Sequence, residues 1–194
     1  MSNSSTGFIS VRSRSPKKTL NVDIPAVLYH ASPLSELEEL TPQSKTIRDP
    51  EEGPVVFATP DLAYATMFLV PTDDSWVIIG VHNNLYYIAI SDRETFLELD
   101  KGGAIYSLPV DNFYCDLAKS GREKEWVCKA SVKPLNKTTV TSALYAMMEH
   151  GVQVFFIPKE TFNKMYAEPE RAVTFLTDTV SENKRSGINY LSFL

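Results

Sequence analysis

The stretch Glu125-Trp126-Val127-Cys128-Lys129-Ala130-Ser131-Val132-Lys133-Pro134 decides how the rest of the chain is interpreted. Every second residue from Trp126 to Val132 is apolar, which predicts a β-strand with one buried face. Pro134 ends this strand because proline has no N–H for the sheet. Glu125 stands at the strand's start beside a tryptophan, where a carboxylate is held rigidly and partly desolvated. Such a group can stabilise a cation that develops during a reaction. The alternative is an ordinary solvated glutamate at the rim.

The composition is that of a globular protein with a sizeable core. The chain has 194 residues, of which 43% are hydrophobic and 22% are charged. The formal net charge is −5, which argues against a protein built mainly to hold nucleic acid. The charge is uneven, because the first 20 residues contain four basic residues and no acid, and the remainder is strongly acidic. Those four are Arg12, Arg14, Lys17 and Lys18.

Cysteine usage and hydropathy indicate a cytoplasmic protein without a membrane partner. Cys115 and Cys128 have no C-x-x-C spacing and suggest no disulfide framework, which fits a reducing compartment. The sequence contains no apolar run of about 18 residues and no apolar core of a signal peptide.

We expect three regions along the chain. Residues 1–22 are predicted to be a disordered basic tail. A Ser- and Arg-containing start without acids also leaves open an organellar address, or an arm that is phosphorylated or touches nucleic acid. Residues 23–178 form the folded domain. Residues 179–194 are predicted to be a C-terminal segment whose apolar end docks on the body.

The predicted strands outnumber the helices and do not alternate regularly with them, so the fold class is α+β. A helix over 33–40 is suggested by Ser32-Pro33 and three leucines, and another is expected to begin at Thr138 or Thr139 and to end at His150-Gly151. The other predicted helices cover 60–70, 91–99 and parts of 159–178, with a break near Pro169. The predicted strands are 26–30, 55–58, 76–81, 85–90, 104–108 and 152–157, with a hairpin at 82–84 and with 152–157 in a central position.

The histidines do not predict a metal site. His82 falls in the hairpin turn and His150 at a helix end, and neither has a Cys or an acid at ligand spacing. The chain contains no phosphate-binding glycine loop, no G-x-S-x-G and no H-E-x-x-H. His30 differs from the other two because it lies near the end of a predicted strand, before a small residue and Ser32-Pro33.

Three short stretches stand out together: Leu28-Tyr29-His30-Ala31-Ser32, then Val55-Val56-Phe57-Ala58-Thr59-Pro60-Asp61-Leu62-Ala63-Tyr64-Ala65, then Glu125-Trp126-Val127. In this order they resemble the histidine-containing branch of the ADP-ribosyltransferase superfamily, over roughly residues 26–157. The resemblance implies a split mixed sheet flanked by short helices, and NAD as the substrate. It also implies that Glu125 is the catalytic carboxylate and that His30 holds the NAD.

The resemblance further implies that the NAD-binding residues come from the first two stretches and from nearby aromatic side chains. We expect these to be Ala31, Ser32, Phe57, Thr59, Phe68 and Tyr106. Two positions depart from the family pattern. Ala31 stands where the family has Gly, and Val56 stands where the family has the Tyr that stacks on nicotinamide. Phe57, Phe68 or Tyr106 is the expected replacement for that ring.

Three functions therefore remain open. The first is transfer of ADP-ribose from NAD to an unidentified protein or nucleic-acid acceptor. The second is a binding module on the same fold without turnover, because Val56 removes the stacking ring. The third is NAD-dependent removal of a 2′-phosphate from RNA, which is disfavoured because no basic cluster lies outside the tail.

Overall fold

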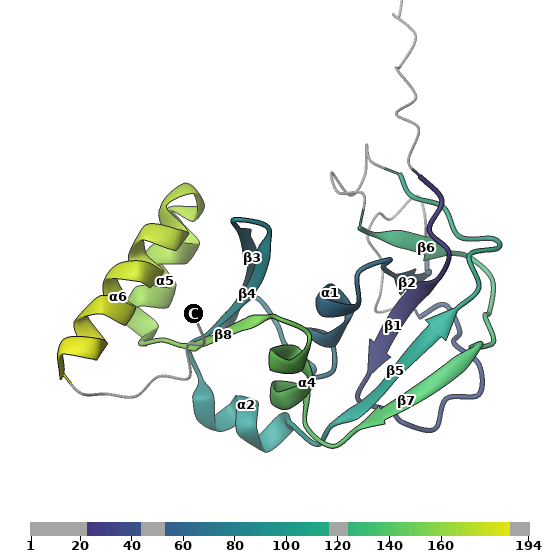
Figure 1. The fold of residues 1–194 in the computed structure, drawn as a ribbon, viewed down its shortest axis with the longest axis horizontal. Helices are drawn as coiled ribbons and strands as arrows, with labels where there is room; N and C mark the ends of the chain where they lie inside the picture. The colour runs from purple at the N-terminus through teal and green to yellow at the C-terminus, as the bar shows by residue number, and fades with distance from the viewer. Residues whose placement is uncertain (1–22, 44–52, 117–123, 187–194) are drawn as a thin grey trace, which may run out of the picture.

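The computed structural model describes residues 23–43, 53–116 and 124–186, with the backbone alone at 183–186. The predicted tail 1–22 and the last residues of the predicted docking segment, 187–194, lie outside these ranges. Within them the fold is mixed α+β, with three small sheets and five α-helices. The predicted fold class is therefore confirmed at this level (Figure 1).

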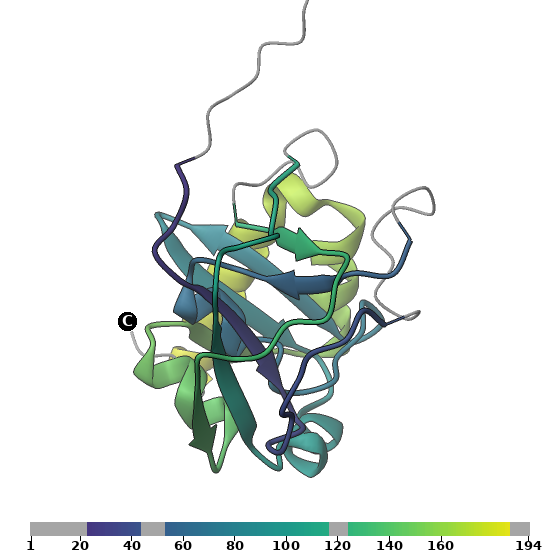
Figure 2. The same cartoon turned by 90° about the vertical axis from the view of Figure 1, so that its right-hand side faces the viewer.

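The first layer is built from five strands. Antiparallel pairing gives the order β1 (Leu28–Ser32), β5 (Gly103–Leu108) and β7 (Asn136–Val140). A separate antiparallel pair joins β2 (Val56–Ala58) to β6 (Trp126–Cys128). The two groups meet where Tyr29 and Thr59 exchange backbone hydrogen bonds of 2.7 and 2.9 Å. The spatial order is thus β7-β5-β1-β2-β6, and Figure 2 shows this layer from its outer side.

The second layer is a three-stranded sheet. Its strands β3 (Val77–His82) and β4 (Leu85–Ile90) form the predicted hairpin, whose turn has Asn83 and Asn84 at φ 50° and 62°. Asparagine tolerates this left-handed conformation better than most residues. β8 (Gln153–Phe156) pairs in parallel with β4 alone among the described strands, so the predicted central position is wrong. The strand is nevertheless apolar because helices cover both of its faces.

The helices separate and flank these layers (Figure 1). Their bounds are α1 Leu62–Thr66, α2 Arg93–Leu99, α4 Ala143–Glu149, α5 Lys159–Ala167 and α6 Ala172–Ser186, with a 3-10 turn η1 at Pro169–Arg171. α1 and α4 contribute Ala65 and Met147 to the core between the two layers. α5 and α6 cover the opposite face of the second layer, where Met165 packs with Tyr87. The predicted break near Pro169 is confirmed.

The helix predicted over 33–40 does not form. Leu40 instead exchanges two backbone hydrogen bonds of 2.8 Å with Val132. The hydroxyl of Tyr106 donates to the carbonyl oxygen of Leu34 at 2.7 Å and accepts from the N–H of Leu37 at 3.1 Å. These tertiary bonds replace the bonds that a helix would have provided. The same bridge takes Val132 out of the predicted strand, and β6 ends at Cys128.

The helix that the sequence predicts to begin at Thr138 or Thr139 begins later in the structure. Residues 136–140 form β7 and not the first turn of a helix, which agrees with the strand preference of the β-branched Thr138, Thr139 and Val140. α4 begins after Ser142, whose hydroxyl accepts a hydrogen bond from the N–H of Tyr145. The predicted C-terminal cap is confirmed, with Gly151 at φ 81°.

Two helix caps differ from those that the sequence predicts, which are Thr59 for the helix over 60–70 and Ser91, in a capping box with Glu94, for the helix over 91–99. Asp61, and not Thr59, caps α1, through a hydrogen bond from the N–H of Tyr64. Asp92, and not Ser91, caps α2, through the N–H of Thr95. In both helices an aspartate one or two residues further along the chain takes the capping position, because aspartate caps a helix at least as well as serine or threonine.

Candidate functional site

The three stretches singled out in the sequence converge in space. His30 lies on β1, Phe57 on β2, and Glu125 immediately before β6. The order β1-β2-β6 makes these strands direct neighbours, although the chain between β2 and β6 contains the whole second-layer hairpin. The candidate site is therefore one continuous edge region of the first layer.

Glu125 lies one residue before β6, and extension of the strand's alternation by that residue assigns it to the face of the first layer that looks toward α1 and the second layer. Trp126 pairs with Ala58, and both pack in the core on the opposite, outer face. Strand alternation then places Glu125 on the inner face, next to Thr59, which is paired with Tyr29. Tyr29 packs against the inner core. Glu125 is half-buried, which is the environment that the sequence predicted for it.

His30 lies on the other face of the same layer. It pairs with Tyr106, their rings are 6.5 Å apart, and Tyr106 belongs to the outer core. The Nδ1 of His30 lies 2.8 Å from the carbonyl oxygen of Phe57. Because a carbonyl only accepts, Nδ1 carries the hydrogen and donates it. Burial lowers the pKa of His30, an effect partly offset by this hydrogen bond, so the imidazole is mainly neutral at pH 7.

The structure brings the other predicted residues together only in part. Ala31 is buried on the inner face. Ser32 is buried, and its hydroxyl accepts from the N–H of Leu34 at 3.1 Å. Thr59 is buried as well, and its hydroxyl accepts from the N–H of Asp61 at 3.1 Å. Both hydroxyls therefore bind a backbone N–H group two residues further along the chain and stabilise the local backbone conformation.

The three aromatic candidates differ in accessibility. Tyr106 is 0% exposed, and its hydroxyl is engaged with Leu34 and Leu37. Its ring therefore offers no surface to a ligand in this structure. Phe57 is half-buried, and Phe68 is 45% exposed. Of the three, Phe68 is the one that presents a ring to solvent.

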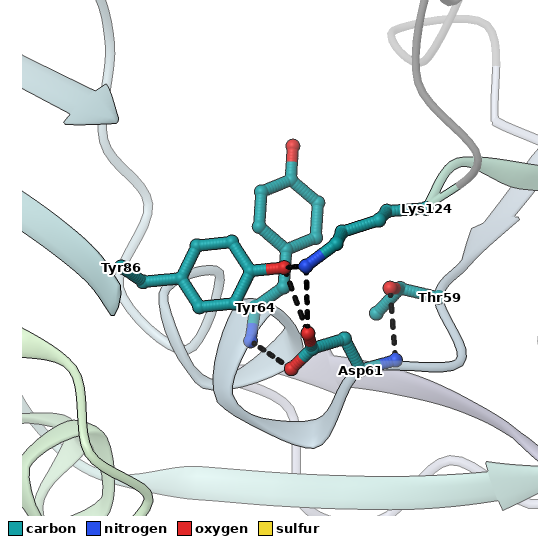
Figure 3. Close-up of polar contacts among 5 residues, drawn as sticks. All are labelled: Thr59, Asp61, Tyr64, Tyr86 and Lys124. Carbon is teal, nitrogen blue, oxygen red and sulfur yellow. Dashed lines mark hydrogen bonds and ion pairs between the residues drawn. The ribbon is translucent and has the colours of Figure 1, made fainter. Parts of the chain in front are cut away.

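A polar cluster that the sequence did not reveal lies directly beside Glu125. One carboxylate oxygen of Asp61 is 2.9 Å from the ammonium of Lys124 and accepts a 2.7 Å hydrogen bond from the hydroxyl of Tyr86. Lys124 also contacts that hydroxyl, and its ammonium lies 4.3 Å from the centre of the Tyr86 ring. Figure 3 shows the three side chains pointing toward one another from α1's cap, the start of β6 and β4.

A row of aromatic rings extends from this cluster. The ring of Tyr64 lies 5.4 Å from that of Tyr86 and 5.2 Å, edge-on, from that of Phe68. Such separations are those of favourable aromatic pairs. The row joins the polar cluster to the exposed Phe68 on the inner side of the layer, whereas Val56 packs in the core on the outer face.

The polar cluster has no local signal in the sequence. Asp61 is 63 residues from Lys124 and 25 from Tyr86. Each residue has an ordinary local interpretation, namely a helix cap, a turn lysine and a strand tyrosine. Only the adjacency of β2 and β6, together with the crossing to β4, brings them into contact.

The described residues contain no group of three or more His, Cys, Asp or Glu side chains placed to hold a metal ion. Among the helices of the described ranges, none is long and apolar enough to cross a membrane. Comparison of the chain with protein-family models, with curated proteins and with solved structures gave no match in any of the three.

Proposed function

We propose that this protein transfers the ADP-ribosyl group of NAD to an acceptor, with Glu125 as the carboxylate that stabilises the reacting ribose. The observation that carries the proposal is the adjacency of β1, β2 and β6. Three stretches chosen from the sequence for one chemistry become neighbouring strands. The proposal includes an ADP-ribosyltransferase-like arrangement of the two layers.

The chemistry needs a fixed carboxylate more than it needs a nucleophilic side chain. The bond between the ribose carbon and the nicotinamide nitrogen breaks, and nicotinamide leaves with the electron pair. The ribose then resembles an oxocarbenium ion, as in glycoside hydrolysis. Glu125, half-buried at the start of a strand, stabilises this charge from nearby. The acceptor supplies the new bond to the ribose carbon and loses a proton.

The exposed end of the aromatic row, Phe68, is the proposed surface for the nicotinamide, because Tyr64 and Tyr86 are buried. Phe68 lies just after α1, and Tyr64 supports its ring edge-on from the core. A planar ring held against Phe68 is fixed in orientation by stacking. Phe68 is one of the three residues that the sequence analysis offered as a replacement for the missing ring at position 56.

His30 receives a different role in this proposal from the one that the resemblance implies. It lies on the outer face, so it does not reach a ligand held on the inner face beside Glu125. Through its hydrogen bond to the Phe57 carbonyl it joins β1 to β2. His30 is thus a positioning residue for β2, the strand that Thr59 directly follows.

The proposal is tested by following nicotinamide release from NAD by the full-length protein. Glu125→Gln removes the charge and keeps the shape, and we expect release to fall at least 100-fold. Glu98→Gln, at an exposed position on α2, is the matched control and retains full release. Release that persists in Glu125→Gln would refute the assigned role.

A binding module without turnover is the second candidate, and the separation of His30 and Glu125 on opposite faces favours it. For this candidate NAD causes neither nicotinamide release nor a rise in melting temperature. A rise without release supports an NAD site that lacks its acceptor, and so keeps the first proposal.

A further inference from the structure

A groove of about 880 Å³ runs along the edge of β3. One wall is the segment 68–74, and the other is formed by α5, η1 and the start of α6. Figure 1 shows β3 with these helices on the side away from the first layer. Phe68 belongs both to the first wall and to the proposed nicotinamide surface. The edge of β3 and the acids Asp73 and Asp74 play no part in the proposed NAD chemistry, so the groove is a second candidate site.

β3 is an edge strand, because among the described strands it pairs with β4 only. In the two-residue hairpin, His82 and Leu85 form the hydrogen-bonded pair next to the turn. The alternation of the ladder then directs the backbone N–H and C=O of Val77, Ile79 and Val81 away from β4. The N–H of Val77 is bonded to the carbonyl oxygen of residue 73 at 3.2 Å. Within the described ranges, the backbone groups of Ile79 and Val81 have no such partner.

The floor of the groove is apolar on both sides of this edge. Ile79 packs against the core between the two layers, and Ile78 packs against the core under α5 and α6. The ring of Tyr87 lies across β3 because residue 80 is Gly80, where a Cβ would overlap that ring. Val81 is 54% exposed, and the two isoleucines are half-buried. The two walls therefore flank the edge without covering it.

This edge has none of the usual protection against pairing. Edge strands generally carry lysine, proline, a bulge or inward-pointing charges, which discourage the addition of another strand. The sequence of β3, Val-Ile-Ile-Gly-Val-His, contains none of them. An extended segment that pairs with β3 would bury both the apolar side chains and the open backbone groups.

Charge restricts the kind of partner. The charged residues that line the groove are two acids, Asp73 and Asp74, and both are exposed. The Asp73 carboxylate accepts a 2.7 Å hydrogen bond from the N–H of Ser75, whereas Asp74 has no such partner within the described ranges. Two acids disfavour the phosphates of a nucleic acid and favour a basic group. Because both precede β3, the basic group belongs at the N-terminal end of that strand.

A segment of a partner protein fits this groove better than a second copy of the chain. A second copy would bring its own two walls against those already present, whereas an extended segment brings one strand. Antiparallel pairing is the more stable arrangement per residue, and it places the C-terminal end of the segment beside Asp73 and Asp74. We propose that the groove binds an extended segment of a partner protein, which adds to β3 as an antiparallel strand with alternate apolar side chains and a basic C-terminal end.

The proposal is tested by fluorescence anisotropy with the full-length protein and a labelled synthetic peptide of alternating valine and threonine that ends in two arginines. We expect saturable binding, and binding at least tenfold weaker for the peptide that ends in two glutamates. N-methylation of every second amide removes the donors from one edge of the peptide. Methylation of the edge that faces β3 should abolish binding, and methylation of the opposite edge should leave it. Equal effects of the two methylations would overturn strand addition.

Val81 provides a matched pair of variants. Its N–H points away from β4, so Val81→Pro removes a donor from the groove and keeps the β3–β4 hairpin. We expect this variant to bind the arginine peptide at least tenfold more weakly. Val81→Thr keeps the N–H and the β-branched shape and should bind as the wild type does. Equal binding by the two variants would overturn the proposal, provided that slow exchange of the Ala89 amide shows an intact hairpin.

Asp74 tests the charge contact. Asp74→Lys should reverse the preference, so that the glutamate peptide binds more tightly than the arginine peptide. Asp111→Lys makes the same change of charge at an exposed position outside the groove and should leave the preference as it is. A preference that Asp74→Lys does not alter would overturn the assigned basic end.

Amide hydrogen exchange, read by NMR, identifies the paired backbone. The saturating arginine peptide should slow exchange at Ile79 and Val81 at least tenfold. Absence of binding, or binding without this slowing, would overturn the proposal. So would slow exchange at both amides before peptide is added. Slow exchange that disappears on dilution would identify a second copy as the occupant, and slow exchange that persists would identify another part of the same chain.

Discussion

The ammonium of Lys124 lies 2.9 Å from the carboxylate of Asp61, and this ion pair joins the residue before Glu125 to the residue that caps α1. Tyr86 of β4 donates to the same carboxylate oxygen, so this oxygen atom links the segment before β6, the start of α1 and the second layer. The backbone at the candidate carboxylate Glu125 is thereby fixed through the neighbouring Lys124.

Removal of this ion pair is expected to cost little stability. The two side chains are 42% and 29% exposed, so solvent screens their attraction. A double-mutant cycle with Lys124→Met and Asp61→Asn should give a coupling energy of about 0.5–1 kcal/mol in urea unfolding. The exposed pair Lys164–Glu160, at 55% and 78%, is the control and should couple more weakly. Equal coupling in the two cycles would contradict the anchoring role.

Asp100 is expected to make stability depend on acid pH. Burial alone would raise the pKa of Asp100, but hydrogen bonds from the N–H groups of Ala143 and Leu144 and from the Ser142 hydroxyl lower it overall. The unfolded chain therefore binds a proton first as pH falls. The contribution is complete above the unfolded pKa of about 4, and is lost as pH falls through the folded value.

Asp100→Asn tests this expectation through urea unfolding between pH 7 and pH 2.5. The variant should lose about 1–3 kcal/mol at pH 7, because the start of α4 loses a charged acceptor. The difference from the wild type should shrink toward low pH. The exposed Asp111→Asn is the control and should change stability little at any pH. A difference that stays constant with pH would show that Asp100 acts by shape alone.

His30 should impose a pH dependence near neutrality. Its pKa is lowered in the folded protein, whereas the unfolded chain protonates near pH 6.5. Stability should therefore fall as pH decreases from about 6.5 toward the folded pKa, and should level off below it. An NMR titration of the ring should give a value under 6.5. His30→Gln keeps a donor for the Phe57 carbonyl and should flatten the curve; an unchanged slope in this variant would assign the effect to another group.

Substitutions at two glycines allow the cost of backbone strain to be measured separately from the cost of steric crowding. Gly102 and Gly151 both have a left-handed φ, 72° and 81°. A Cβ at Gly102 would lie 2.1 Å from the Val140 carbonyl oxygen, whereas a Cβ at Gly151 would meet nothing within 4 Å. Gly151→Ala should cost about 1 kcal/mol in thermal or urea unfolding, from strain alone. Gly102→Ala should cost at least twice as much, and similar losses would mean that the β5–β7 end relaxes around the methyl group.

The sequence predicted the elements whose signals are local. The hairpin around Asn83 and Asn84, the end of α4 at Gly151 and the break at Pro169 are each determined by a backbone preference within a few residues. The half-buried position of Glu125 agrees with the expectation that this carboxylate is partly desolvated at the start of a strand.

The missed features depend on contacts between distant residues. The leucines at 34, 37 and 40 have helical spacing, but the hydroxyl of Tyr106, about 70 residues away, binds the backbone of this segment. β8 has the apolar sequence of a central strand because helices from both sides bury it. The opposite faces of His30 and Glu125 depend on the register of three strands, which alternation within one strand does not reveal.

The small size of α1 has a consequence for the order in which the chain folds. A helix of five residues is not stable alone, because its few hydrogen bonds do not offset the cost of nucleation. Its cap, Asp61, is also held by Lys124 and Tyr86, which come from different layers. α1 therefore becomes stable only when the core between the two layers, to which its Ala65 belongs, has formed. We expect this helix to be among the last elements to form, so that the site is completed when the two layers pack together.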